Sequence, residues 1–190
     1  MILPIRAFGD AVLRKKAHNI EKDYPELQTL IDNMFETMYG ANGIGLAAPQ
    51  IGLDIRLFVV DVSPLSEDED YEDIADELKD FKKVFINARI LKESGEEWKF
   101  NEGCLSIPEV REDVKRKSTI KIEYYDRNFV KHTDTFSDIR ARVIQHEYDH
   151  IEGILFTDHL SALKKKIVKG KLQKIANGEV AVSYKMRFPK

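Results

Sequence analysis

One stretch limits the fold of this chain more than any other. Residues 143–153 read VIQHEYDHIEG and bring two histidines and several acidic residues together. The surrounding apolar positions form one stripe at helical spacing, which predicts a largely buried helix: Ile139, Val143, Ile144 and Ile151. Ser137 or Asp138 can cap its start, and Gly153 can end it. Such a polar cluster is either a metal site or a chance grouping, and the rest of the chain must decide.

The two histidines have the spacing of a metal site. His146 and His150 are four residues apart, so on a helix their rings project from one face and can share an ion. Glu147 lies beside them without having to bind, which completes the H-E-x-x-H pattern. A structural pairing of buried histidines is the alternative. Two histidines do not hold a catalytic ion, so a third ligand is needed.

The third ligand does not lie downstream. Phe156 stands where one common protease pattern has a histidine, and residues 160–176 contain no acidic residue. The other candidate is Cys104 in NEGCLSIPEV. A cysteine, two histidines and a water would fill a four-coordinate hydrolytic site. The alternative for Cys104 is a small buried hydrophobe.

Length and composition narrow the class of protein. The 190 residues and 22.0 kDa predict one domain, residues 1–190. The net charge of −3 lacks the basic excess of DNA-binding proteins. A short N-terminal apolar run broken by Pro4 is not a secretory signal, and no segment reaches the roughly 20 apolar residues of a membrane span. With a single cysteine, the chain is expected in the cytoplasm.

The coarse pattern predicts an α+β fold, with antiparallel strands around the histidine-bearing helix and a further helix near each end. The first helix is expected at 24–39, with Pro25 in its first turn, followed by a glycine-rich loop at 41–52. Strands are expected at 55–62, 84–91 and 118–125, with an edge strand at 180–188. The acidic segment 66–80 is expected to be a mobile surface insertion with little direct role.

Three segments resemble the signature motifs of the peptide deformylase family. They are GIGLAAPQ at Gly43–Gln50, EGCLS at Glu102–Ser106 and QHEYDH at Gln145–His150, and they occur in the family's order. The resemblance extends from GDAVLRKKA near the start to DHLSALKKK after the helix. It implies a hydrolase that removes the formyl group from nascent chains beginning with formyl-methionine and releases formate.

The resemblance also implies roles for individual residues. Cys104, His146 and His150 would bind the ion, which would be Fe(II) in the cell, replaceable by Zn, Ni or Co. Glu147 would be the general acid and base. The Gln50 side chain and the Leu105 backbone N–H would stabilise the negative charge that develops on the formyl oxygen.

Substrate binding is expected along the first two motifs. Gly43, Ile44 and Gly45 would pair with an extended peptide, although a tight turn also explains the glycines. Gly103 flanks the thiol in the same region. Val143, with Leu105 and Ile44, would line the methionine pocket, for which core packing is the competing explanation.

Charged residues around the helix give further expectations. Glu102 would be buried near the ion with Arg116 as its partner. Arg142 is expected at the pocket rim. Asp149 is expected either to support a ligating histidine or to lie at the surface. The other histidines have no partner at ligand spacing and are expected at the surface or as caps: His18, His132 and His159.

A last helix is expected at 161–176, with lysines on its polar face: Lys164, Lys165, Lys166, Lys169, Lys171 and Lys174. This face is either simply solvated or meets ribosomal RNA, as the resemblance suggests. The residues alone leave two other functions possible for the whole chain. One is a metallopeptidase that cuts internal peptide bonds, and the other is a non-catalytic protein stabilised by its ion.

Overall fold

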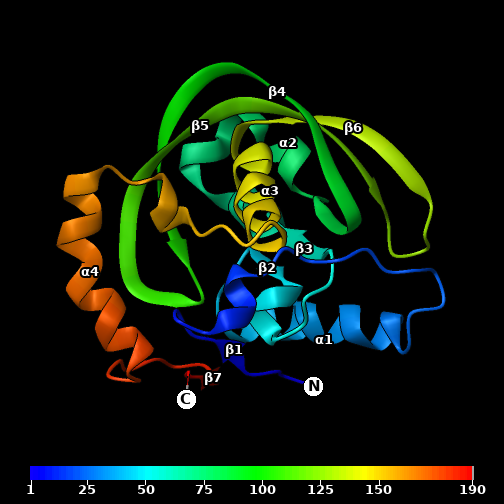
Figure 1. Cartoon of the computed structure of the whole chain (residues 1–190). Helices are drawn as coiled ribbons and strands as arrows, with labels where there is room; N and C mark the ends of the chain where they lie inside the picture. The colour runs from blue at the N-terminus through cyan, green and yellow to red at the C-terminus, as the bar shows by residue number, and fades with distance from the viewer. Residues whose placement is uncertain (190) are drawn as a thin grey trace.

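A bent antiparallel sheet wraps around one central helix in the computed structural model, which describes residues 1–189 (Figure 1). The helix, α3 (Asp138–Ile151), carries the histidines. The five strands lie in the order β2-β3-β4-β5-β6. Their bounds are β2 Gly45–Ala47, β3 Leu57–Asp61, β4 Lys82–Cys104, β5 Ile107–Tyr125 and β6 Lys131–Ser137. The α+β fold predicted from the sequence is confirmed.

Strand β3 lies at the middle of the core. All five of its residues are buried, as the unbroken apolar run predicted. Phe58 and Val60 pack in the cluster that includes Ile144 of α3. Leu57 and Val59 pack in a second cluster with α1 (Leu27–Gly40). Helix α3 therefore covers one face of the sheet at β3, and α1 covers the other. Strand β3 holds β2 between these two helices.

The hairpin β4–β5 is much longer than the sequence predicted. Strands were expected only at 84–91 and 118–125, whereas the pairing of β4 with β5 extends as far as Cys104 and Ile107. Charged residues alternate with few apolar ones through 92–117, so the apolar periodicity is weak there. Four register shifts interrupt the ladder. Such bulges bend a strand, which lets the hairpin curve around α3 (Figure 1).

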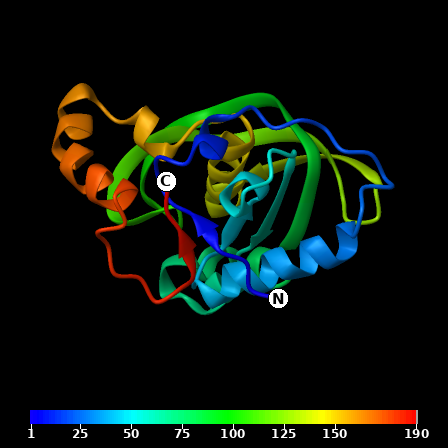
Figure 2. The same cartoon turned by 60° about the horizontal axis from the view of Figure 1, so that its bottom comes forward.

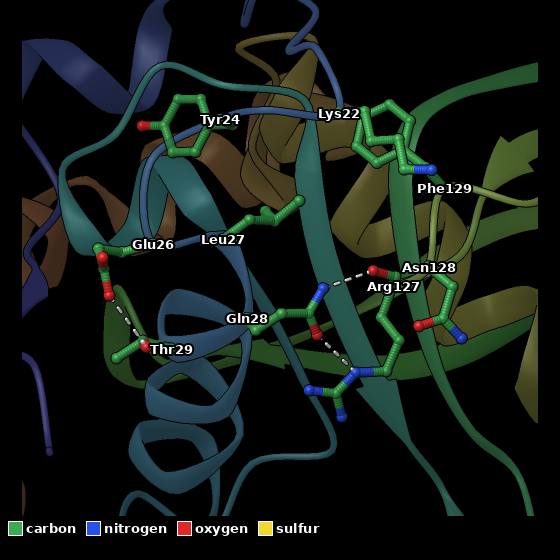
Figure 3. A pocket seen from close by; sticks show the side chains of 9 residues that line it. All are labelled: Lys22, Tyr24, Glu26, Leu27, Gln28, Thr29, Arg127, Asn128 and Phe129. Carbon is green, nitrogen blue, oxygen red and sulfur yellow. Dashed lines mark hydrogen bonds between the residues drawn. The ribbon is translucent and has the colours of Figure 1, made fainter.

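Helix α1 begins later than predicted. Glu26, at φ 54°, is its N-cap, so Pro25 lies outside the helix and the prediction that it occupies the first turn is wrong. The helix is joined to the turn between β5 and β6 across a cavity of about 490 Å³ (Figure 3). There Gln28 Nε2 donates to the carbonyl of Arg127, and Arg127 Nε donates back to Gln28 Oε1.

Residues 41–52 are not a simple loop as predicted. They contain β2 and a 3-10 helix, η2 (Ala48–Ile51). Leu46 and Ala47 pair with Val59 and Phe58 of β3. Both are fully buried, and a buried backbone needs partners for its polar groups, which this ladder supplies.

The acidic segment folds into short helices: η3 (Ser63–Glu67), η4 (Glu69–Ile74) and α2 (Ala75–Leu78). Leu78 is fully buried, and Leu65, Tyr71 and Ile74 pack against the core. Its acidic residues face outwards for the most part. The segment therefore has an apolar side that packs against the domain, and its acidic composition did not predict this packing.

Short segments near the two ends of the chain pair with each other (Figure 2). After η5 (Phe156–His159), helix α4 (Ala162–Ala176) starts at Ser161, whose side chain accepts from the Lys164 N–H, close to the predicted bounds. The edge strand predicted at 180–188 shrinks to β7 (Met186–Arg187), which pairs in parallel with β1 (Ile5–Arg6); the short η1 (Ala11–Arg14) follows β1. Among residues 1–189, no helix is both long and apolar enough to cross a membrane.

Candidate metal centre and active site

Three side chains from two elements converge on one point. Cys104 ends β4, and His146 and His150 lie one turn apart on α3. One ligand atom of each lies within 4.8 Å of the others. Cys104 Sγ is 3.3 Å from His150 Nε2. The fold therefore brings together the thiol and the two imidazoles that the sequence singled out.

The chemistry of this group fits a divalent transition-metal ion. A thiolate with two imidazoles suits zinc or iron far better than calcium or magnesium. His146 Nδ1 is 3.0 Å from Glu102 Oε2, so its other ring nitrogen is free to bind an ion. Burial lowers the pKa of His150 to about 3, which keeps this imidazole neutral as a ligand must be. Three protein ligands leave a position for water or substrate.

Glu102 is the centre of a buried ionic network. It accepts from Arg116 Nε at 2.8 Å and Nη2 at 3.0 Å, and from Arg142 Nη1 at 2.8 Å. Burial raises the pKa of Glu102, but the hydrogen bonds with His146 and Arg116 outweigh it and hold the pKa well below its usual range. The carboxylate is thus a permanent negative charge that fixes the ring of His146.

Arg142 lines the active-site cavity, but as a buried side chain and not at the exposed rim that the sequence suggested. Its side chain is buried and lies under the hairpin, where it donates to the carbonyls of Val114 at 3.0 Å and Trp98 at 2.7 Å. Its guanidinium also stands 4.6 Å from the centre of the Trp98 ring. Burial lowers the pKa of Arg142, and Glu102 opposes this effect. The arginine is a structural partner of Glu102.

Asp149 supports the network one step further out. It was expected to support a ligating histidine, but it accepts from Arg116 Nη1 at 2.7 Å and from His159 at 2.7 Å. Support therefore passes through Arg116 and Glu102 to His146. His159 has this specific partner, whereas His18 is exposed. His132 pairs with Asp126 at 2.9 Å beside the β5–β6 turn.

Glu147 lies beside the three ligands and is 4% exposed. Its Oε2 is buried without a partner among the described residues. Burial raises the pKa of Glu147 to about 7. A carboxyl group in this range can both accept and release a proton near neutral pH.

The amide of Gln50 faces the thiol. Its Oε1 accepts from the Ala47 N–H at 2.9 Å, which directs Nε2 towards Cys104 Sγ at 3.5 Å and Ser106 Oγ at 3.3 Å. Leu105 lies in the two-residue turn between Cys104 and Ile107. Both candidate donors for a developing negative charge thus lie next to Cys104, one of the three candidate metal ligands.

These residues open onto a cavity of about 820 Å³. Most of the residues predicted for the site line it: Gly43, Ile44, Gly45, Gln50, Glu102, Gly103, Cys104, Leu105, Val143, His146 and Glu147. Arg116 and His150 are not among the residues that line it. Sequence reasoning missed Leu65 and Tyr71 of the acidic segment, and Tyr184 of the C-terminal tail. No local sequence pattern predicts these residues, because they reach the cavity only through tertiary packing.

Comparison with known proteins decides the family. The sequence model of the family described as "Polypeptide deformylase" matches residues 2–166. The chain belongs to this family. It is 61% identical to the peptide deformylase of Christiangramia forsetii, over all of this chain and 97% of that protein. It is 59% identical to that of Flavobacterium johnsoniae, over 99% of this chain and 96% of that protein.

Solved structures of peptide deformylases support the same family. A peptide deformylase from Legionella pneumophila superposes with a TM-score of 0.79 at 38% identity, over 94% of this chain and 98% of that one. That of Thermotoga maritima gives 0.73 at 37% identity, over 85% and 99%. The protein is thus a hydrolase of the polypeptide deformylase family that removes the formyl group from the N-terminal methionine of new polypeptides. It is metal-dependent, and the readings as a metallopeptidase or a non-catalytic protein are set aside.

Proposed function

We propose that Cys104, His146 and His150 hold the catalytic ion and that Glu147 carries the proton during removal of the formyl group. One observation supports this most directly: the three ligand atoms lie within 4.8 Å of one another, beside a buried carboxylate, at the wall of a cavity. When bound, the ion acts as a Lewis acid that lowers the pKa of water and polarises the formyl oxygen.

Glu147 performs both proton transfers in this proposal. Its carboxylate accepts a proton as water attacks the formyl carbon. It then delivers that proton to the amine nitrogen when the C–N bond breaks, which leaves formate and a free N-terminus. A pKa near 7 suits both steps, since the group changes protonation state with little cost at neutral pH.

Gln50 and Leu105 stabilise the charge that grows on the formyl oxygen. The Gln50 amide is already directed by its bond to the Ala47 N–H and needs no reorganisation during the reaction. The Leu105 N–H comes from a turn of only two residues, which also limits its movement. Preorganised donors of this kind contribute on the order of 3 kcal/mol each to transition-state stabilisation.

The peptide binds along the cavity wall. Gly43, Ile44 and Gly45 present backbone next to β2, and an extended substrate can add to this edge. An added β-carbon at Gly43 would lie 2.8 Å from Leu105 Cδ1, and one at Gly103 would lie 2.6 Å from Arg111 Nη1. Val143, Ile44 and Leu105 supply apolar surface for the methionine side chain.

We further propose Fe(II) as the ion in the cell, replaceable by Zn, Ni or Co, since all four accept the Cys and His donor set. Metal analysis of protein purified without oxygen tests the identity of the ion. We also propose a single catalytic domain over residues 1–190 that acts in the cytoplasm. Contact between the lysines of α4 and ribosomal RNA stays a prediction, tested by cosedimentation with ribosomes at rising salt.

Formate release from a formyl-Met peptide is the deciding experiment. The wild type should release formate, and Glu147→Ala should not, although both contain the same amount of metal. Cys104→Ala and His150→Ala should lose metal and activity together. An active Glu147→Ala variant with full metal content would refute the role of Glu147.

A further inference from the structure

Segments near the two ends of the chain meet at the turn that follows Cys104. This turn, Leu105 and Ser106, joins the paired residues Cys104 and Ile107. The carbonyl groups of its two residues have no partner within the hairpin and depend on groups outside it. Ser106 O accepts from the N–H of Phe8, just after β1, at 2.8 Å.

The other carbonyl is bound by the C-terminal tail. The hydroxyl of Tyr184 donates to Leu105 O at 2.7 Å, across 79 residues of sequence. The tail is itself fixed, because the N–H groups of Ile5 and Ala7 donate to Lys185 O and Arg187 O, both at 2.9 Å. Figure 2 shows this tail running beside β1. Tyr184 is also part of the wall of the active-site cavity.

The bond restrains the one peptide whose rotation changes the turn. In a four-residue turn, types I and II differ by a flip of the central peptide, which here joins Leu105 to Ser106. The carbonyl oxygen of that peptide is Leu105 O, the atom held by Tyr184. A flip would change ψ of Leu105 and φ of Ser106, and so the conformation of the residue whose N–H is the proposed donor to the formyl oxygen.

We propose that Tyr184 is a positioning residue, which holds the Leu105 carbonyl and so fixes the turn that presents the Leu105 N–H to the reacting formyl oxygen. This inference rests on the role proposed above for Leu105. The hydroxyl is engaged with protein, so it is not needed to bind the substrate in the ground state. Its loss therefore acts on the transition state and lowers kcat without raising KM.

Tyr184→Phe tests the proposal, with Tyr24→Phe as the matched control. Tyr24 lies at the cavity near the start of α1, away from the active site (Figure 3). Tyr184→Phe should lower kcat about fivefold, the effect of one lost hydrogen bond, and leave KM within about twofold. It should also shift the ¹H–¹⁵N amide resonance of Ser106 and speed hydrogen exchange at Phe8. Tyr24→Phe should change none of these.

Two results would overturn the proposal. An unchanged Ser106 resonance in Tyr184→Phe would show that the hydroxyl does not hold the turn. A raised KM at unchanged kcat would make Tyr184 a substrate-binding residue. The amide spectra do not depend on activity, so a wild type that releases no formate would refute the proposed function while the Ser106 resonance still decides what Tyr184 holds.

Discussion

The carboxylate of Glu147 lies against the backbone of Gly45. A β-carbon added at Gly45 would clash with Glu147 Oε1 and stand 2.8 Å from its Cδ. Such a separation is far inside van der Waals contact. A glycine is thus required at position 45, because Glu147, the proposed acid and base on α3, occupies the space that a β-carbon would need. The glycine also allows a substrate backbone to approach.

Gly45→Ala should therefore displace the Glu147 carboxylate. We expect kcat to fall at least tenfold, because a group misplaced by about 1 Å loses much of its catalytic effect. The metal content should stay unchanged, since the three ligands lie on other positions. Formate release and metal analysis measure the two quantities.

The same substitution elsewhere is the control for this test. Gly170 lies on α4, and an added β-carbon meets nothing within 4 Å. Gly170→Ala should keep full activity and stabilise the protein by about 0.5–1 kcal/mol through helix propensity. Full activity in Gly45→Ala would show that Glu147 tolerates the displacement.

Removal of Arg142 should destabilise the whole fold. Arg142→Met leaves Glu102 without one of its buried partners and frees the carbonyls of Trp98 and Val114. Breaking a buried ion pair on one side costs about 3–5 kcal/mol. Urea unfolding should show this loss, whereas Arg89→Met, at an exposed pair with Glu123, should barely change the midpoint.

The sequence predicted the site better than its surroundings, and the reason is physical. His146, Glu147 and His150 are spaced by the helix itself, so their common face can be read locally. Their position relative to Cys104 depends on the β4–β5 hairpin. The length of this hairpin could not be predicted, because its apolar periodicity is weak. The family resemblance supplied what local pattern could not.

The contacts of Arg142 and Tyr184 could not be predicted from the sequence. Arg142 is expected at the pocket rim from the sequence, but a buried carboxylate and two carbonyls from the hairpin make its burial possible. Tyr184 lies in a tail whose position depends on the pairing of β7 with β1, at opposite ends of the chain. Neither contact leaves a signal in the nearby sequence.

Asp158 should make stability depend on acid pH. Burial raises the pKa of Asp158, but the hydrogen bonds from Arg14 and the Leu155 N–H outweigh it and lower the pKa. A lowered folded-state pKa contributes stability above the unfolded value of about 3.9, and this is lost as the pH falls through the folded value. Because the side chain is 39% exposed, we expect only about 0.5–1 kcal/mol.

Asp158→Asn isolates this contribution. The variant should be less stable than the wild type at pH 7, and the difference should shrink as the pH falls below about 3.9 towards the lowered folded-state pKa. Urea unfolding at pH 7, 5 and 3 measures it, and comparison within each pH removes the effect of other titrating groups. A difference of the same size at pH 3 as at pH 7 would assign the loss to packing or to the neutral hydrogen bonds.

Metal removal should lower the melting temperature. An ion bound only by the folded state stabilises it by RT ln(1 + [M]/Kd), about 4 kcal/mol when the metal concentration is 1,000 times Kd. Chelator should therefore lower Tm, and stoichiometric metal should restore it. Cys104→Ala lacks one of the three ligands, so its Tm should respond little to chelator. If the wild type and Cys104→Ala lost the same number of degrees, the ion would be bound elsewhere than at Cys104, His146 and His150.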